Sequence, residues 1–279
     1  MKNKYFFLCI LVLLFSCSGR SHKKVNQLEQ PIESTKIIKM VIDSKSDTKL
    51  SIDSIVDLFS SALDSHPGRL NIPEMIAVAN LIPNYRSFLK EYLPLGKNLN
   101  IDFIGQIHVS DPSVNAIIPL KVISCQKNIK KILDSINYDV IGHESLSLWE
   151  FNEKTYMQEF YHSLNMQYSE KDLTFKNLSY ENTCKIDGVI AFWIKNPNAH
   201  IVGVEDSSLY DLNIAAMQHN DSIGYEIVKL RSYIAIARLI KIMNQRGYKR
   251  GVLVLGVLHA KDIILIAKHF GIKMNVYSE

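Results

Sequence analysis

The chain has 279 residues, with 32 basic and 28 acidic side chains and a formal net charge of +4. This nearly balanced charge gives no argument for nucleic-acid binding, which concentrated basic patches would favour. The length after the first fifty residues is enough for one sizeable core with an inserted subdomain, so we predict a single domain over residues 51–279.

The first residues of the chain form a short basic segment followed by an apolar one. Two lysines precede an unbroken apolar run over residues 5–15, which ends in Ser16-Cys17. The run is too short to span a membrane, for which ~20 apolar residues are needed. A small residue before a cysteine resembles the lipobox, whose cysteine is lipidated and becomes the mature N-terminus. We therefore expect residues 1–17 to be a signal peptide and Cys17 to carry lipid; the alternative is an ordinary secretory signal.

That interpretation places the protein in the cell envelope, lipid-anchored to a membrane outside the cytoplasm. Residues 18–50 are polar and are predicted to be a flexible tether. Outside the cytoplasm, Cys125 and Cys184 could form a disulfide, and two buried thiols are the alternative.

The next elements are predicted from apolar periodicity. Residues 51–95 have apolar side chains at helical spacing, interrupted near Pro83, and are predicted to form a helical face or cap. After residue 100 the pattern changes to short apolar runs joined by segments long enough for a helix. These runs are 101–105, 138–142, 200–204, 252–256 and 272–277. They predict an α/β fold whose mainly parallel sheet is covered by helices on both faces.

Capping residues support the intervening helices. Asp111-Pro112 is a typical helix start. An apolar stripe over residues 227–243 is followed by Gly247, and a last helix over residues 260–270 is followed by Gly271; both glycines are typical of helix ends.

Four of the five predicted strands end in a glycine followed closely by a histidine or a glutamate. The residues that follow these glycines are His108, His143 with Glu144, Glu205, and His259. Ligand sites of open parallel sheets lie at the carboxyl ends of the strands, so these side chains are expected to share one cleft. A single histidine after a strand is usually structural, but two histidines with two carboxylates suit Zn²⁺, Mn²⁺, Fe²⁺ or Co²⁺.

A weak internal repeat supports this site. Residues 101–111 align without gaps on residues 252–262, and both copies contain Gly-x-x-His with an aspartate three residues later. We expect Asp111 and Asp262 each to cap the following helix, whose partly positive N-terminus would favour an anionic oxygen.

Two further residues are candidates for the same site. Arg231 lies beside an apolar stripe, and a partly buried arginine needs a carboxylate or an anionic ligand. Its predicted partner is Glu144, Glu205 or a substrate carbonyl or carboxylate. His143 is either a second-layer support for Glu144 or only its neighbour.

These motifs resemble those of the TraB/Tiki superfamily, which includes the TraB, GumN-like, Tiki and ChaN-like proteins. The resemblance covers roughly residues 100–277. It implies a metal-dependent hydrolase in the Tiki branch. Its motif histidines correspond to His108 and His259, its acidic positions to Glu144 and Glu205, and its arginine to Arg231. Gln106 departs from the threonine or glutamate found in relatives, and because an amide cannot be a general base, it argues against the esterase-type mechanism.

An aromatic segment at 149–180 is predicted to be an inserted helical subdomain. Its aromatic residues are Trp149, Phe151, Tyr156, Phe160, Tyr161, Tyr168, Phe175 and Tyr180. They either pack on one another or form a lid that holds an extended peptide or haem.

The predicted function is metal-assisted, peptidase-like hydrolysis. His108, His259 and one glutamate would hold Mn, Co, Zn or Fe, the other glutamate would accept a proton, and Arg231 would stabilise an oxyanion. The alternatives are a haem- or iron-binding ChaN-like lipoprotein and a non-catalytic binding protein with a degenerate site. The substrate, a peptide or small molecule, and the oligomeric state do not follow from the sequence.

Overall fold

The computed structural model describes residues 38–42, 51–65, 73–107, 120–144, 153–163, 167, 169–172, 174, 187–218 and 223–278. Several predictions fall outside this set. They concern the signal peptide with Cys17, most of the tether, His108, the helix start at Asp111-Pro112, Cys184 and part of the aromatic segment.

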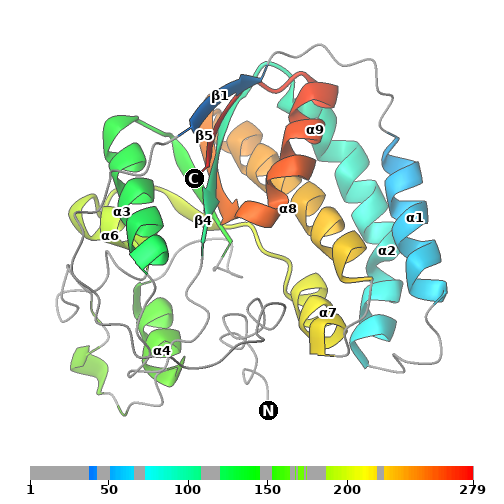
Figure 1. The fold of residues 1–279 in the computed structure, drawn as a ribbon, viewed down its shortest axis with the longest axis horizontal. Helices are drawn as coiled ribbons and strands as arrows, with labels where there is room; N and C mark the ends of the chain where they lie inside the picture. The colour runs from blue at the N-terminus through cyan, green and yellow to red at the C-terminus, as the bar shows by residue number, and fades with distance from the viewer. Residues whose placement is uncertain are drawn as a thin grey trace, which may run out of the picture.

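The centre of the molecule is a six-stranded sheet with strand order β1-β6-β2-β5-β3-β4 (Figure 1). The strands are β1 (Ile38–Ile42), β2 (Asn100–Gln106), β3 (Val140–His143), β4 (Ile201–Gly203), β5 (Arg250–Gly256) and β6 (Met274–Ser278). Strands β2 to β6 run parallel, and β1 pairs antiparallel with β6 at the edge. All five predicted strands are confirmed, as is the α/β class.

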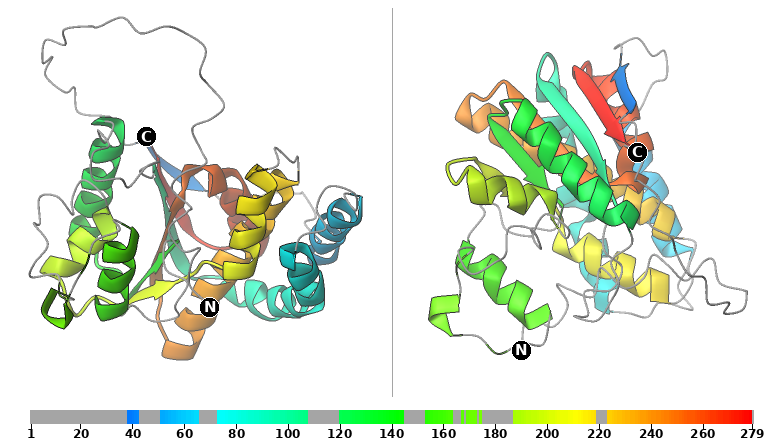
Figure 2. Two further views of the ribbon diagram at one scale, coloured as in Figure 1. Left: turned by 90° about the horizontal axis from the view of Figure 1, so that it is seen from below. Right: turned by 60° about the vertical axis from the view of Figure 1, so that its left-hand side comes forward.

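Helices cover both faces of this sheet. They are α1 (Ile52–Asp64), α2 (Pro73–Tyr92), α3 (Leu120–Ser135), α4 (Glu153–Ser163), α6 (Gly188–Lys195), α7 (Ser207–Gln218), α8 (Gly224–Arg246) and α9 (Ala260–Phe270). Short 3₁₀ turns lie at Leu93–Gly96, Glu170–Asp172 and Val257–His259. Helices α3 and α6 pack on one face, and α8 and α9, backed by α1, α2 and α7, on the other (Figure 2). No helix in the described ranges is long and apolar enough to cross a membrane.

The strands are apolar on both sides because both faces are covered. Along β2, Phe103 packs into the core with α8 and α9, while the adjacent Ile104 packs toward α3 and α6. This burial on both faces is the reason that the strands are continuous apolar runs rather than alternating ones in the sequence.

The chain connections create a switch point between β2 and β5. Strand β2 leads through α3 to β3, whereas β5 leads through α9 to β6 in the opposite direction along the sheet. The two connecting helices lie on opposite faces, as right-handed crossovers require. Gln106 and Gly256, which are paired in register, mark the carboxyl ends where the connections separate. Ligand sites of open α/β sheets lie at such a point.

Helix α8 is the central helix of the larger core. Its buried side chains face both the sheet and the outer helices α1, α2 and α7. Gly251 of β5 allows this close packing, because a Cβ there would lie 2.8 Å from Sδ of Met243 and 3.3 Å from Cδ2 of Leu239, both on α8. The helix ends predicted at Gly247 and Gly271 are confirmed, with φ of 70° and 67°.

Three local predictions differ from the structure. Strand β1 lies inside the range predicted as tether, since an edge strand is held by main-chain hydrogen bonds that composition does not reveal. Helix α2 runs through Pro83 without the predicted break, and its buried face, which includes Tyr85 and Leu89, holds the helix together. Asp262 lies in the first turn of α9 rather than at its N-cap, because the turn Val257–His259 leads directly into the helix.

Candidate functional site

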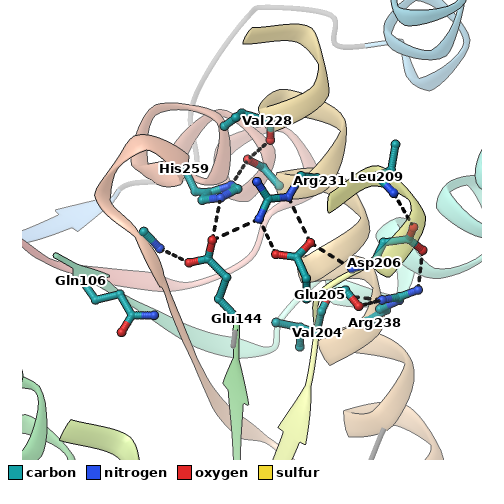
Figure 3. A network of polar contacts seen from close by, with 12 residues as sticks. Gln106, Glu144, Val204, Glu205, Asp206, Leu209, Val228, Arg231, Arg238 and His259 are labelled. Atoms are coloured by element: carbon teal, nitrogen blue, oxygen red, sulfur yellow. Dashed lines mark hydrogen bonds and ion pairs between the residues drawn. The ribbon is translucent and has the colours of Figure 1, made fainter. Parts of the chain in front are cut away.

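The carboxyl edge of the sheet brings together Glu144, Glu205, Arg231 and His259 (Figure 3). Glu144 directly follows β3, Glu205 follows β4, and His259 ends the turn after β5. Arg231 reaches them from α8, which packs across β3 and β5. The structure therefore places four of the predicted site residues together; His108 lies outside the described residues.

Arg231 and Glu205 form a buried two-point ion pair. Arg231 Nε donates to Glu205 Oε1 at 3.0 Å, and Nη2 donates to Oε2. The side chains are only 6% and 9% exposed. Glu205 Oε1 also accepts a hydrogen bond from the main-chain N–H of Asp206 at 3.0 Å. Both carboxylate oxygens of Glu205 are thus engaged, and the flat guanidinium is fixed in one orientation.

Glu144 is the second carboxylate beside Arg231. Its Oε1 accepts from Arg231 Nη2 at 3.2 Å, and its Oε2 accepts from the N–H of Gly256 at the end of β5. The main-chain N–H of Glu144 donates to Val254 at 3.2 Å, which continues the pairing of β3 with β5. Main-chain pairing therefore fixes where the Glu144 carboxylate lies.

The two neighbouring carboxylates stabilise the protonated form of Arg231. Burial alone would lower its pKa, but the attraction of Glu205, and then of Glu144, outweighs burial and raises the pKa above the ordinary arginine value. The guanidinium lies 5.3 Å from the ring centre of Tyr210. Its Nη1 makes no hydrogen bond within the described part of the chain. Two N–H donors of a permanent cation therefore remain available to a ligand.

His259 completes the group from the other side of Glu144. Its Nε2 lies 3.4 Å from Glu144 Oε1, and its Nδ1 lies 2.8 Å from Ser232 Oγ. The imidazole is buried, with 5% of the side chain exposed. The Nε2 atom and the Glu144 carboxylate thus face a common point.

A second polar network supports Glu205 from behind. Asp206 accepts from the N–H of Leu209 at 3.1 Å and so caps α7, and it also accepts from Tyr85 Oη at 2.8 Å and Arg238 Nη2 at 2.6 Å. Arg238 Nη1 donates to the main-chain oxygen of Glu205. Burial, and then the nearby Asp206, raises the pKa of the Tyr85 phenol. The helical segment predicted as a cap therefore contacts the residues that hold the site.

These supporting residues are not among the site residues predicted from the sequence. Asp206 precedes Ser207 at the start of a helix, which is a typical capping position, and Arg238 lies two helical turns after Arg231. Both signals could have been found. Ser232, by contrast, carries no sequence signal that distinguishes it from any other serine.

His143 points to the opposite face of the sheet from Glu144, as adjacent strand residues do. It is fully buried, and its Nε2 lies 3.4 Å from Asp187 Oδ1. Asp187 also caps α6 by accepting from the N–H groups of Val189 at 3.0 Å and Ile190 at 3.1 Å. Burial would raise the pKa of Asp187, but His143 and these N–H groups lower it overall.

Gln106 and Cys125 lie near the end of β2. The Gln106 amide is buried and donates to the main-chain oxygen of Val254 at 3.5 Å. Cys125 is buried, and its Sγ accepts from the N–H of Ile107 at 3.3 Å. Cys184, its partner in the disulfide alternative, lies outside the described residues.

The described donors fit a metal ion only in part. Among the described residues there is no group of three or more histidine, cysteine or acidic side chains arranged to hold one. His259 and Glu144 provide two converging donors, whereas Glu205 is engaged by Arg231. A third protein ligand would have to come from outside the described residues, where the predicted ligand His108 lies.

The aromatic segment is described in part. Helix α4 confirms helical structure there, and Tyr156 packs on the core formed with α3 and α6. The other aromatic side chains of the segment lie outside the described set.

Comparison with protein-family models, with curated proteins and with solved structures finds no match for this chain.

Proposed function

We propose that the protein is a metal-dependent hydrolase of the TraB/Tiki type, acting on a peptide or a related amide. The observation that carries the proposal is the available Nη1 group of buried Arg231, beside the converging donors of His259 and Glu144. A fixed cation next to paired nitrogen and carboxylate donors suits a reaction in which negative charge develops on a carbonyl oxygen.

The geometry separates the roles of the two glutamates. Glu205 positions Arg231, because both of its oxygens accept hydrogen bonds from the guanidinium. Glu144 faces His259 and is therefore the candidate ligand or proton acceptor. We propose His259 Nε2 and Glu144 as two ligands of a divalent ion, with His108 as the third on the basis of the resemblance.

When bound, the ion would supply Lewis-acid activation of a carbonyl group and of water. Arg231 Nη1 would donate to the oxygen that gains charge. The Gly256 N–H and Arg231 Nη2 hold the Glu144 carboxylate in place, so little reorganisation is needed during the reaction.

The test compares two histidines near the ends of α9. His259→Ala should abolish bound metal and peptide cleavage while leaving the far-UV circular dichroism unchanged, because the side chain belongs to the site rather than to the apolar core. His269 lies in the last turn of the same helix, and His269→Ala should retain both the bound metal and peptide cleavage. Metal content, cleavage of a peptide library and the visible spectrum are measured for each protein.

The haem- or iron-binding alternative is an outcome of the same measurement. No contact of the described residues favours it over hydrolysis. A wild-type protein with a Soret band, without a divalent ion and without cleavage would replace the hydrolase by a haem carrier. Equal loss of metal and cleavage in His269→Ala would also contradict the assignment of His259.

We further propose that Cys17 carries the lipid that anchors the protein to a membrane, on the basis of the lipobox-like ending of the apolar run. Cys17→Ser should move the protein from the membrane to the soluble fraction or leave the signal uncleaved. If the variant is processed and fractionates like the parent, the lipoprotein interpretation is wrong.

A further inference from the structure

Ser232 is a buried side chain next to the proposed site that the mechanism above does not use. It follows Arg231 on α8 and is fully buried. Its Oγ donates to the main-chain oxygen of Val228, one turn earlier, at 2.9 Å. The same Oγ lies 2.8 Å from Nδ1 of His259.

The hydrogen bonds of Ser232 determine which nitrogen of His259 carries a proton. A serine hydroxyl has a single proton, whereas a main-chain carbonyl can only accept. Because that proton is directed to Val228, Ser232 Oγ is the acceptor in its contact with His259. The Nδ1 atom must then be protonated.

This tautomer leaves Nε2 as the nitrogen directed at Glu144. A neutral imidazole protonated on Nδ1 has its lone pair on Nε2, 3.4 Å from Glu144 Oε1. Beside a carboxylate this lone pair needs a positive partner, which either a proton or a divalent ion can supply. The opposite tautomer would carry its proton on Nε2. That N–H would donate a hydrogen bond to Glu144, so both Nε2 and the carboxylate oxygen would be occupied.

We propose that Ser232 is a positioning residue that holds His259 in the tautomer able to bind a divalent cation through Nε2. The inference rests on the proposed function for the identity of the cation, but its statement about the proton on Nδ1 stands on the geometry alone. A hydrogen-bond partner on the far nitrogen is a common way to orient a metal-binding histidine.

The experiment uses the full chain with ¹⁵N-labelled histidine. In the wild type, the ¹⁵N shifts of His259 should show a protonated Nδ1 both without and with Zn²⁺, and bound Zn²⁺ should leave Nε2 without a proton. In Ser232→Ala the acceptor is lost, so Nδ1 should lose its proton and the ring proton should lie on Nε2, where it can bond to Glu144. The affinity for Zn²⁺, measured by calorimetry, should fall roughly 10- to 100-fold.

Two variants separate positioning from a purely structural role. Ser87→Ala removes the same kind of hydroxyl-to-carbonyl bond within a helix, from Ser87 to Pro83 at 3.0 Å, and should change neither tautomer nor affinity. Ser232→Thr keeps a hydroxyl and should restore the protonated Nδ1.

Each result has a distinct meaning. An unprotonated Nδ1 in the wild type, or an unchanged tautomer in Ser232→Ala, would overturn the inference. If the wild type shows the expected tautomer and Ser232→Ala loses it, but neither protein binds Zn²⁺, then the proposed metal-dependent function fails while the role of Ser232 in setting the tautomer is supported.

Discussion

Arg231 and Arg86 each contact two carboxylates, but in different surroundings. Arg231 is 6% exposed, whereas Arg86 is 31% exposed and bridges Asp53 and Asp57 on the outer helices at 2.8 Å and 2.5 Å. Burial makes the difference energetically important, because a buried carboxylate that loses its partner is left without solvent or a counter-charge. The same substitution at the two positions should therefore have unequal effects.

Arg231→Met should lower the free energy of unfolding by about 3–5 kcal/mol, the cost of leaving buried carboxylates unpaired. Arg86→Met should cause little measurable change, because exposed ion pairs contribute little. Urea unfolding of both variants measures the difference. Equal losses in the two variants would show that the Arg231 pairs are not buried as the structure has them.

At the scale of elements, α6 packs on α3 through a glycine at its first position. A Cβ on Gly188 would lie 2.2 Å from the main-chain oxygen of Gln126, and the Gly188 N–H donates to Gln126 Oε1 at 2.8 Å. The first position of α8 is also a glycine, but a Cβ on Gly224 would have its nearest neighbour at 4.0 Å. The same substitution can therefore be compared at a crowded helix start, Gly188, and at an open one, Gly224.

Gly188→Ala should destabilise the protein by about 1–3 kcal/mol, because a methyl group has no room beside a main-chain atom. Gly224→Ala should be neutral or stabilise by about 0.4–1 kcal/mol through the lower entropy of the unfolded chain. Thermal and urea unfolding distinguish them. A stable Gly188→Ala protein would contradict the close approach of α6 to α3.

At the scale of the whole molecule, one apolar core connects the N-terminal helices to the sheet. It includes Phe59 of α1, Leu89 of α2, Ile236 of α8 and Leu253 of β5. The contact of Tyr85 with Asp206 adds a polar link from α2 to the proposed site. Helices α1 and α2 therefore belong to the same folding unit as the sheet.

We expect unfolding in urea to be a single cooperative transition, because breaking this core exposes helices and sheet together. Far-UV circular dichroism and the fluorescence of the two tryptophans should give the same midpoint. Trp193 on α6 reports on the face opposite to α1 and α2. A first step that loses helical signal without a change in fluorescence would show that the N-terminal helices unfold separately.

Local patterns in the sequence determined the fold class and the strand ends. Strands buried on both faces require continuous apolar runs, and the left-handed ends of α8 and α9 require glycine, so both features are readable without coordinates. The association of Arg231 with strand-end glutamates was also predicted from the sequence, because a buried arginine needs an anionic partner.

Only the tertiary structure decided how these residues divide their roles. The sequence left Glu144 and Glu205 equivalent, whereas the crossing of α8 over the strand ends pairs Glu205 with Arg231 through two bonds and leaves Glu144 facing His259. Strand β1 and the contact of Tyr85 with Asp206 also join residues far apart in the chain. Such contacts depend on strand order and helix packing, which bring together side chains whose sequence separation carries no periodic signal.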